Sequence, residues 1–439
     1  MRRKTATRLS PVFFSFLILI SGCFFHEFCL ASEGSSTAPA ANNIIILQTG
    51  PENTIKFELG GVFQTDYHYY NESERADNRF DIRRAQIELT CHLNDWLKLN
   101  LEYELKNDVT DRLMDTYAEI SFNAQAFRIG HFKKPFSLEF QTLDAEIYFA
   151  ERSMGAFLSP GRDVGAMISG SLFDNHIYYA AGLFNADGED TSGSGNDQDE
   201  AEVTGRLVLS PFTDSGIECL QNFQFGGAAT YAKINLSDLS LMVKSSGMVD
   251  TSRNIYKLGH DTKFGVIQDV DDRWRIGAEA AWAWKSLACQ AEYIRLTYTS
   301  LKPAGSKAQD ADFSSWYVSM LYFMTGEQPT FSKGIMDPVP PKNPFDVSTG
   351  NYGAFGIAAR YDHFKGDKDW INPVSHVSVE EADAYSLAIN WMLFSMHRII
   401  LDYTYTDLSD PIRVRVNTDG SVDYIDKENA VTLRYSINF

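Results

Sequence analysis

The chain has 439 residues, of which 58 are Asp or Glu and 39 are Lys or Arg, so its formal charge at pH 7 is −19. Nucleic-acid backbones are bound by basic surfaces, and this charge balance therefore excludes a nucleic-acid partner as the first expectation. Aromatic residues make up 13% of the chain, although its mean hydropathy is negative. This combination is typical of a membrane β-barrel, in which only alternate residues of each strand face lipid.

The first predicted element is a secretory signal peptide at residues 1–31. Basic side chains at positions 2, 3, 4 and 8 precede an apolar stretch, 12–20, which is too short to span a bilayer. We favour cleavage after Ala31; the alternative is a lipoprotein-like Ile-Ser-Gly-Cys sequence in which Cys23 becomes a lipidated N-terminus. A barrel is held by its own lipid-facing surface and needs no acyl anchor. We expect residues 32–54 to be a periplasmic lead-in and residues 55–439 to be an outer-membrane barrel.

Strand-like segments separated by turn-rich pieces fill the rest of the chain. They are 56–70, 78–92, 96–106, 113–122, 125–133, 162–173, 176–185, 200–211, 223–233, 273–284, 287–298, 313–325, 351–364, 382–392, 396–406 and 428–439. These segments number sixteen, and a single-chain bacterial barrel requires an even number. We therefore assign a weaker candidate, 262–268, to a loop. The predicted fold class is all-β, a transmembrane antiparallel β-barrel with inward-folded constriction loops.

The last segment shows the strand pattern most clearly. Over residues 431–439, apolar side chains at odd positions alternate with polar side chains at even positions, including Arg434. A period of two indicates a strand with one face toward lipid and one toward a water-filled lumen. A soluble β-sandwich also alternates, but the charges on the polar faces of long strands and the aromatic terminus disfavour it. The terminal Phe439 is similar to the C-terminal signal of bacterial outer-membrane proteins, which implies recognition by the barrel-assembly machinery.

Three of the long connections carry features of their own. Segment 186–202 is rich in Asp and Glu, which suits either a divalent ion or a solvated outer loop, and we favour the loop. Segment 326–350 holds five prolines, whose stiffness suits a loop with a fixed path, folded into the lumen. Segment 134–161 contains 143–152, which we expect to form a short helix that narrows the channel. All the long connections are expected at the outer end of the barrel, opposite the tight turns.

The sequence offers little for catalysis or for a cofactor. No HExxH or GxSxG motif occurs, and the three cysteines after the signal peptide, Cys91, Cys219 and Cys289, form no CxxC pair. We therefore expect neither an enzyme, a cofactor nor a metal site.

A phase break around Arg83 and Arg84 is the most informative feature of the lumen. Phe80 and Ile82 share one face, whereas the apolar residues after Arg84 lie on the other. One inserted residue, a β-bulge at this pair, would restore the pattern and let both guanidinium groups enter the lumen. Paired arginines attract phosphate or carboxylate oxygens. The alternative is that they only neutralise carboxylates nearby, such as Asp81, Glu88 or Glu119 in sequence.

Together with further motifs, this pair of arginines resembles the pattern of the phosphate-selective porins O and P. The motifs that carry the resemblance are Phe80-Asp-Ile-Arg-Arg-Ala-Gln-Ile-Glu88, Asp95-Trp96, Leu101-Glu-Tyr103, Arg128-Ile-Gly-His-Phe-Lys-Lys-Pro-Phe-Ser-Leu-Glu139, Glu151-Arg-Ser153, Pro160-Gly-Arg-Asp-Val-Gly165, Gln290-Ala-Glu-Tyr293, Thr325-Gly-Glu327, Arg360-Tyr-Asp362 and Asn390-Trp391. Their order and spacing cover nearly the whole chain after the signal peptide. The resemblance implies a trimeric channel of sixteen strands with a narrowed waist.

The resemblance also implies roles for single residues. Arg83, Arg84 and Arg152 correspond to the arginines of the waist, Asp115 to the acid beside them, and Lys333 to one of several loop lysines. Further basic residues that we expect in the lumen are Arg128, Arg162, Arg273, Arg275 and Arg434.

The chain departs from the family pattern at three positions. Val62 stands where phosphate-selective members carry an arginine, Gln86 where they carry a tyrosine, and Phe140 where they carry a lysine. The set of anion-binding residues is therefore about half present.

The predicted function is an outer-membrane porin that passes small hydrophilic solutes, with a preference for anions such as phosphate. The alternatives are a general or cation-tolerant porin and a plugged barrel with a structural or adhesive role. The expected partners are small anions or other small solutes, outer-membrane lipids and two further copies of the chain in a homotrimer.

Overall fold

The computed structural model describes residues 43–48, 54–71, 78–106, 112–186, 201–236, 239, 241–247, 254–258, 262–416 and 418–439. The chain divides into two units, Met1–Ala41 and Asn42–Phe439, and the second holds all the described residues. The proposed signal peptide, Cys23 and most of the acidic segment 186–202 lie outside the described residues. Among the described residues, no helix has both the length and the apolar character needed to cross a bilayer.

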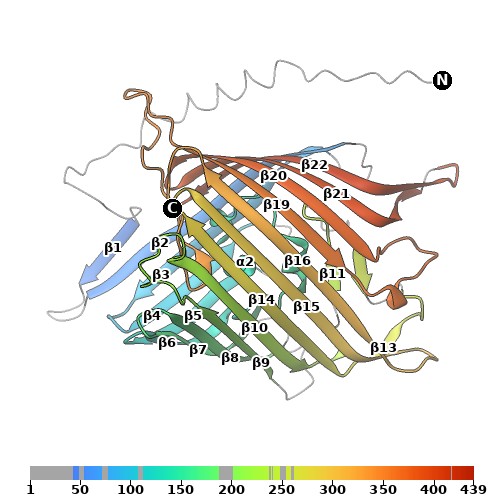
Figure 1. Ribbon diagram of the computed structural model, residues 1–439. Helices are drawn as coiled ribbons and strands as arrows, with labels where there is room; N and C mark the ends of the chain where they lie inside the picture. Colours follow the sequence, from blue (N-terminus) through green and yellow to red (C-terminus); the bar gives the residue numbers. More distant parts are fainter. Residues whose placement is uncertain are drawn as a thin grey trace. The chain divides into compact units, whose positions relative to one another are not determined.

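Sixteen antiparallel strands form a closed ring (Figure 1). They are β2 (Thr54–Asn71), β3 (Arg79–His92), β4 (Leu97–Glu104), β5 (Leu113–Phe122), β6 (Gln125–Lys133), β7 (Arg162–Leu172), β8 (Ile177–Phe184), β9 (Glu202–Leu209), β10 (Asn222–Lys233), β14 (Asp272–Trp284), β15 (Leu287–Pro303), β16 (Gln309–Phe323), β19 (Ala354–Lys365), β20 (Glu381–Phe394), β21 (His397–Val416) and β22 (Val422–Asn438). The ring closes because β2 pairs with β3 on one edge and with β22 on the other. All sixteen predicted strands are confirmed, and the closed ladder leaves no open backbone edge in the membrane.

Several short accessory strands are not members of this ring. β1 (Asn43–Gln48) pairs with the first residues of β2. β13 (Ile267–Asp269), in the segment that we assigned to a loop, pairs with the end of β15. Two small hairpins, β11 (Leu241–Val243) with β12 (Tyr256–Leu258) and β17 (Phe331–Ser332) with β18 (Ile335–Met336), complete the sheet structure.

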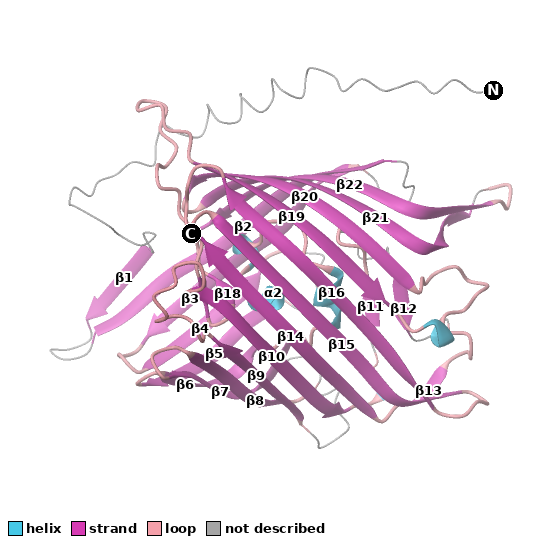
Figure 2. Ribbon diagram, in the orientation of Figure 1, coloured by secondary structure: helices cyan, strands magenta, loops and turns pink. Residues whose placement is uncertain are grey.

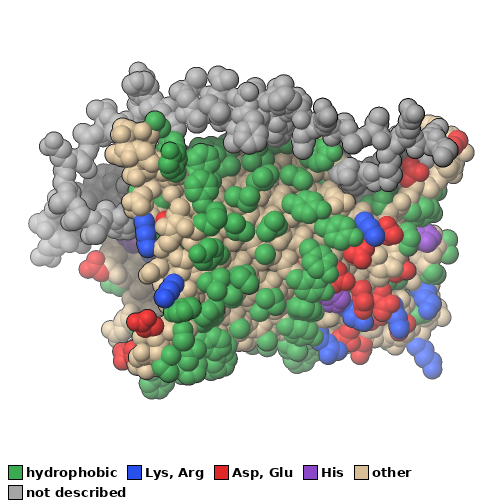
Figure 3. Space-filling model, turned by 45° about the horizontal axis from the view of Figure 1, so that its top comes forward, with side chains coloured by type: hydrophobic (Ala, Val, Ile, Leu, Met, Phe, Trp, Pro, Cys, Tyr) green, Lys and Arg blue, Asp and Glu red, His purple; other side chains and the backbone are tan. Residues whose placement is uncertain are grey.

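Alternation along the strands separates a lipid-facing surface from the lumen. In β20, Tyr385, Leu387 and Ile389 are exposed, whereas Ser386 and Ala388 between them are buried. Figure 3 shows a largely hydrophobic surface over the strands, with charged side chains gathered toward one side. The polar positions face the inside, where inserted segments and lumenal water can satisfy them.

Two of the connections predicted to be long are mostly strand. β15 continues to Pro303 and β16 already begins at Gln309. Likewise, β21 continues to Val416 and β22 begins at Val422. The expected loops 299–312 and 407–427 are therefore too long. The hairpins extend because cross-strand backbone bonds still satisfy the chain beyond the apolar band.

The long connection 324–353 lies at the end of the barrel that carries the tight turns, which corrects our expectation of an outer loop. Strand directions alternate, so the connection after β16 falls at the same end as the turns 285–286 and 395–396 and as Phe439. The segment does fold inward as expected: the Gln224 amide on β10 donates to the Phe331 carbonyl at 2.8 Å. Phe331 and Met336 pack with Tyr148 and Phe149 of the loop between β6 and β7.

The loop between β6 and β7, residues 134–161, is called the constriction loop below. It contains α2 (Leu138–Gln141) and two 3-10 turns, η1 (Asp144–Glu146) and η2 (Met154–Leu158), which Figure 2 shows behind strands β14–β16. A further 3-10 turn, η4 (Lys368–Trp370), lies between β19 and β20.

The helix predicted at 143–152 is wrong apart from the η1 turn. Wall side chains bind the backbone groups that such a helix would use for itself. Asn390 donates to the Tyr148 carbonyl, Arg398 donates to the Ile147 carbonyl, and Asp402 accepts from the Ala150 amide. The segment therefore stays extended against the wall.

We predict that Gly165→Ala destabilises the barrel by about 1–3 kcal/mol, because overpacking displaces well-packed neighbours. A methyl group at Gly165 would overlap the carbonyl oxygen of Leu183 and the ring of Phe184. The matched control is Gly205→Ala, where the nearest heavy atom, the carbonyl oxygen of Ala180, lies 3.9 Å away. Urea unfolding in detergent, followed by tryptophan fluorescence, measures both; equal midpoints for the two variants would contradict the prediction.

Candidate functional site: the constriction of the channel

A β-bulge at Arg83 brings two adjacent arginines into the lumen. Gln64 pairs with Arg84 and Thr65 pairs with Ile82, so Arg83 is the extra residue on β3. This is the bulge that the phase break predicted. Without it, one of the two guanidinium groups would face hydrocarbon.

Both arginines bind carboxylates of the constriction loop. Nε and Nη2 of Arg83 donate to the two oxygens of Glu151 at 2.7 and 2.8 Å. Nε of Arg84 lies 2.9 Å from Asp144, and its Nη1 donates to Gln64 at 2.7 Å. The carboxylates that we proposed as neutralising partners, Asp81, Glu88 and Glu119, are not the ones that bind them. Neutralisation does occur, but by acids from a distant part of the chain.

Arg434 on β22 extends this network. Its guanidinium group binds both oxygens of Asp66 at 2.8 and 2.7 Å and Glu151 at 3.0 Å, and it also donates to the carbonyl of Ala150. Arg434 is only 1% exposed, and its bonds to Glu151 and to the Ala150 carbonyl anchor the loop to β22.

Arg152 lies within the constriction loop and is held by an acid and by backbone carbonyl groups of the same loop. Its Nη1 is 2.6 Å from Asp144, while Nε and Nη2 donate to the carbonyls of Glu139 and Thr142 at 3.2 and 2.8 Å. The structure thus brings Arg83, Arg84 and Arg152 into one network.

Asp115 does not join that network directly. Its carboxylate accepts from Nε of Arg162 on β7 at 2.7 Å, and Arg162 also lies 3.9 Å from Glu102. Asp115 and Arg162 therefore form a second ion pair on the wall.

The remaining candidates lie elsewhere. Arg128 pairs with Glu119 at 2.6 Å and stacks on the ring of Tyr117. Arg273 and Arg275 both bind Glu202, at 2.9 and 3.2 Å, and all three are buried. Lys333 is exposed at the turn of the β17–β18 hairpin, with its ammonium group 5.7 Å from the centre of the Tyr178 ring.

Sequence reasoning missed two wall arginines that hold the constriction loop. Arg360 on β19 binds Glu139 at 3.0 Å, and Arg398 on β21 binds Glu146 at 3.0 Å. Side-chain alternation along β19 and β21 places Arg360 and Arg398 on the lumen side, and this pattern could have identified both. Their acidic partners, however, lie more than 200 residues away in the chain.

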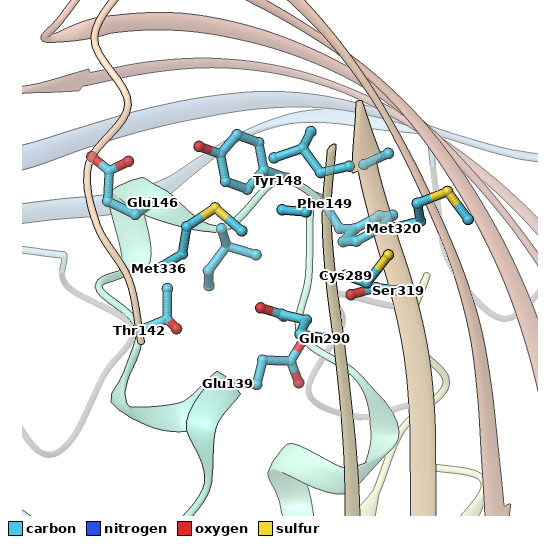
Figure 4. A pocket seen from close by; sticks show the side chains of 14 residues that line it. Glu139, Thr142, Glu146, Tyr148, Phe149, Cys289, Gln290, Ser319, Met320 and Met336 are labelled. Atoms are coloured by element: carbon cyan, nitrogen blue, oxygen red, sulfur yellow. The ribbon is translucent and has the colours of Figure 1, made fainter. Parts of the chain in front are cut away.

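The apolar side of the constriction loop also packs on the wall. Figure 4 shows the narrow cavity between them: Glu139, Thr142, Glu146, Tyr148 and Phe149 of the loop lie opposite Gln290 and Ser319 of the wall, with Met336 of the second inserted segment beside them. Aromatic rings pack between the loop and the wall; the ring of Tyr148, for example, meets that of Phe323 edge to face. Ion pairs thus hold the loop at its acidic residues, and apolar packing holds the residues that lie between those acids.

The two central carboxylates of the loop remain ionised. Burial opposes the ionisation of Asp144, but Arg152 and Arg84 outweigh it and hold its pKa well below the usual range. Burial likewise opposes the ionisation of Glu151, and Arg83 and Arg434 overcome it, so this pKa is also held well below the usual range. Because the pKa falls on docking, the stabilisation is present above the ordinary carboxylate pKa and is lost only as pH falls through the depressed values.

We predict that the ion pairs of Asp144 and Glu151 persist on acidification from about pH 7 to pH 5, a window above the ordinary carboxylate pKa values. Glu151 and Asp144 keep their charges there, so the open-channel noise of single channels in planar bilayers stays constant. Noise from loop motion is expected only in strongly acidic solution. A marked rise in noise already at pH 5 would show that the carboxylates do not hold the loop in this way.

Comparison with solved structures shows which fold this is. The chain is similar to the outer-membrane protein OmpT of Vibrio cholerae in its trimer form, with a TM-score of 0.52 and 10% identity over 88% of this chain and 99% of that chain. It is also similar to the outer-membrane channel DcaP of Acinetobacter baumannii (TM-score 0.51, 11% identity, 88% and 97% covered). The anion-selective porin of Comamonas acidovorans gives a TM-score of 0.50 at 12% identity, with 88% and 100% covered.

Comparison with known sequences shows the family. No curated protein matches the chain. The family model described as phosphate-selective porin O and P matches residues 57–439, which is nearly the whole barrel. The expectations of an outer-membrane β-barrel and of a channel that is not an enzyme follow from this match and are confirmed. The chain belongs to the phosphate-selective porin O and P family.

Proposed function

We propose that this porin is a diffusion channel for small hydrophilic solutes that prefers anions such as chloride and phosphate. The observation that carries the proposal is the charge balance of the network around the constriction loop. Four guanidinium groups, those of Arg83, Arg84, Arg152 and Arg434, share three carboxylates, those of Asp66, Asp144 and Glu151. The network as a whole is therefore cationic.

The mechanism is electrostatic. Lumenal water is confined at the constriction, so charges there act on a passing ion more strongly than charges at the open mouth. An anion is attracted to the surplus positive charge but is bound weakly, because each guanidinium group already has a protein partner. Weak attraction allows both entry and exit, which conduction requires.

The departures at Val62, Gln86 and Phe140 favour a general anion preference over strict phosphate selectivity. Each removes a side chain that the family pattern uses for anion binding, and no basic residue stands at any of the three positions. Conductance that rises linearly with phosphate concentration would agree with a loose preference, whereas saturation at low phosphate would indicate a tight site.

Three further points belong to the proposal. We infer a homotrimer, since the similar OmpT of Vibrio cholerae is described in a trimer form. We infer export through residues 1–31. We also infer recognition of the C-terminal strand by the barrel-assembly machinery. Phe439 supports the last point, because it exchanges backbone hydrogen bonds with Gly61 at the ring closure while its side chain stays 43% exposed.

The second candidate function is a closed barrel with a structural or adhesive role. It is favoured by the number of segments inside the lumen: the constriction loop, the β11–β12 hairpin and the β17–β18 hairpin all take part in buried clusters. A closed barrel gives no current steps when purified protein is added to a planar bilayer. Steps of uniform size would exclude it.

The charge balance predicts the sign of the ion selectivity. In a potassium chloride gradient across a planar bilayer, the reversal potential should correspond to a chloride permeability above that of potassium. The surplus guanidinium charge at the constriction is the reason. A reversal potential of the opposite sign would overturn the anion preference and leave the porin assignment intact.

Removing one loop carboxylate should strengthen the preference. We predict that Glu151→Gln raises the ratio of chloride to potassium permeability about threefold, the effect of one unit charge acting over several ångströms through water. The matched control is Glu381→Gln, since Glu381 pairs with the exposed Lys365 at 2.7 Å, away from this network. An unchanged or lower ratio in Glu151→Gln, compared with the control, would contradict the role of the network.

A further inference from the structure

We propose that Lys133, together with Arg152 and the ring of Phe140, forms a binding subsite for a small oxyanion beside the constriction. The proposal rests on the proposed anion preference and names the side chains that hold the anion. Lys133 is the last residue of β6, where the chain turns into the constriction loop.

Two cations converge on one backbone carbonyl at this place. Nζ of Lys133 donates to the Thr142 carbonyl at 3.4 Å, and Nη2 of Arg152 donates to the same carbonyl at 2.8 Å. The bond of Lys133 is long, and among the described residues no carboxylate lies within ion-pair distance of its ammonium group. An ammonium group retains unused donors in this arrangement, since it carries three and shows one weak bond.

The ring of Phe140 supports both cations. The ammonium nitrogen of Lys133 lies 5.4 Å from the ring centre, and the guanidinium carbon of Arg152 lies 5.5 Å from it. Both distances allow a cation–π attraction. Phe140 stands where the family pattern has a lysine, so in this chain the ring gathers two neighbouring cations in place of the missing one.

A third cation faces the same point from the wall. Lys133 and Arg162 are direct cross-strand partners in the β6–β7 ladder. Like charges directly opposite each other in a sheet are destabilising. Arg162 is compensated by Asp115 at 2.7 Å and Arg152 by Asp144 at 2.6 Å, which leaves Lys133 as the uncompensated member.

This arrangement suits a small oxyanion. An anion beside Lys133 would relieve the repulsion among the three cations and accept hydrogen bonds from the unused ammonium donors. Phosphate and carboxylate oxygens have the size and charge for this role. Because Lys133 and Arg152 are half-buried rather than sealed, the anion can leave again.

The test measures chloride and potassium permeability, and the block of chloride current by added inorganic phosphate, for the full chain in planar bilayers. We expect Lys133→Gln to lower the ratio of chloride to potassium permeability about threefold, as one unit charge acting through water would, and to raise the half-blocking phosphate concentration by a similar factor. Lys133→Arg should stay close to the unsubstituted chain. Phe140→Leu changes no charge and should weaken only the phosphate block.

The matched control is Lys98→Gln. Lys98 is a lumenal cation that is already paired with Glu119 at 2.9 Å, so its removal changes the net charge by the same amount at another place. Equal effects of Lys133→Gln and Lys98→Gln, or no phosphate block in the unsubstituted chain, would overturn the subsite while leaving the anion preference in place.

A cation preference in the unsubstituted chain would instead overturn the proposed function and the subsite together. If Lys133→Gln forms no channels, the comparison of Phe140→Leu with the unsubstituted chain decides: an unchanged phosphate block rejects the subsite.

Discussion

Ion pairs between arginines of the inner wall and carboxylates of one inserted loop hold the channel in its shape. Five wall arginines on four strands take part: Arg83 and Arg84 on β3, Arg360 on β19, Arg398 on β21 and Arg434 on β22. Their partners on the loop are Glu139, Asp144, Glu146 and Glu151. Breaking a buried pair by removing one member costs about 3–5 kcal/mol, because the other charge is left uncompensated. The loop is therefore held at several points along its length, and no single pair carries its position alone.

In the proposed function, the same guanidinium groups serve structure and transport. A channel needs charge at its narrowest place, but unpaired charges out of bulk water are costly. Placing slightly fewer carboxylates than guanidinium groups in the network satisfies most of the charge and leaves a small surplus. In this proposal, selectivity depends on a surplus of one positive charge, four guanidinium groups against three carboxylates, so a change of a single side chain can alter it strongly.

Inserted segments enter the lumen from both ends of the barrel. The constriction loop and the β11–β12 hairpin come from the loop end, and the β17–β18 hairpin comes from the turn end. Phe331 and Met336 of the latter pack against Tyr148 and Phe149 of the former. In a separate buried cluster, the β11–β12 hairpin and the η2 turn of the constriction loop cover Ile294 and Leu296 on β15, which explains why these lumen-facing positions are apolar.

The strands and their number, the lipid-facing surface and the bulge at Arg83 were determined by the sequence itself. These features depend on side-chain alternation and on the cost of placing charge in hydrocarbon, both of which act over a few neighbouring residues. The partners of the waist arginines, the extended form of 147–151 and the convergence of Lys133 and Arg152 on Thr142 were decided only by the tertiary structure. Each of these depends on groups that ring closure brings together from distant parts of the chain. Local patterns carry no information about which of many carboxylates will meet a given guanidinium group.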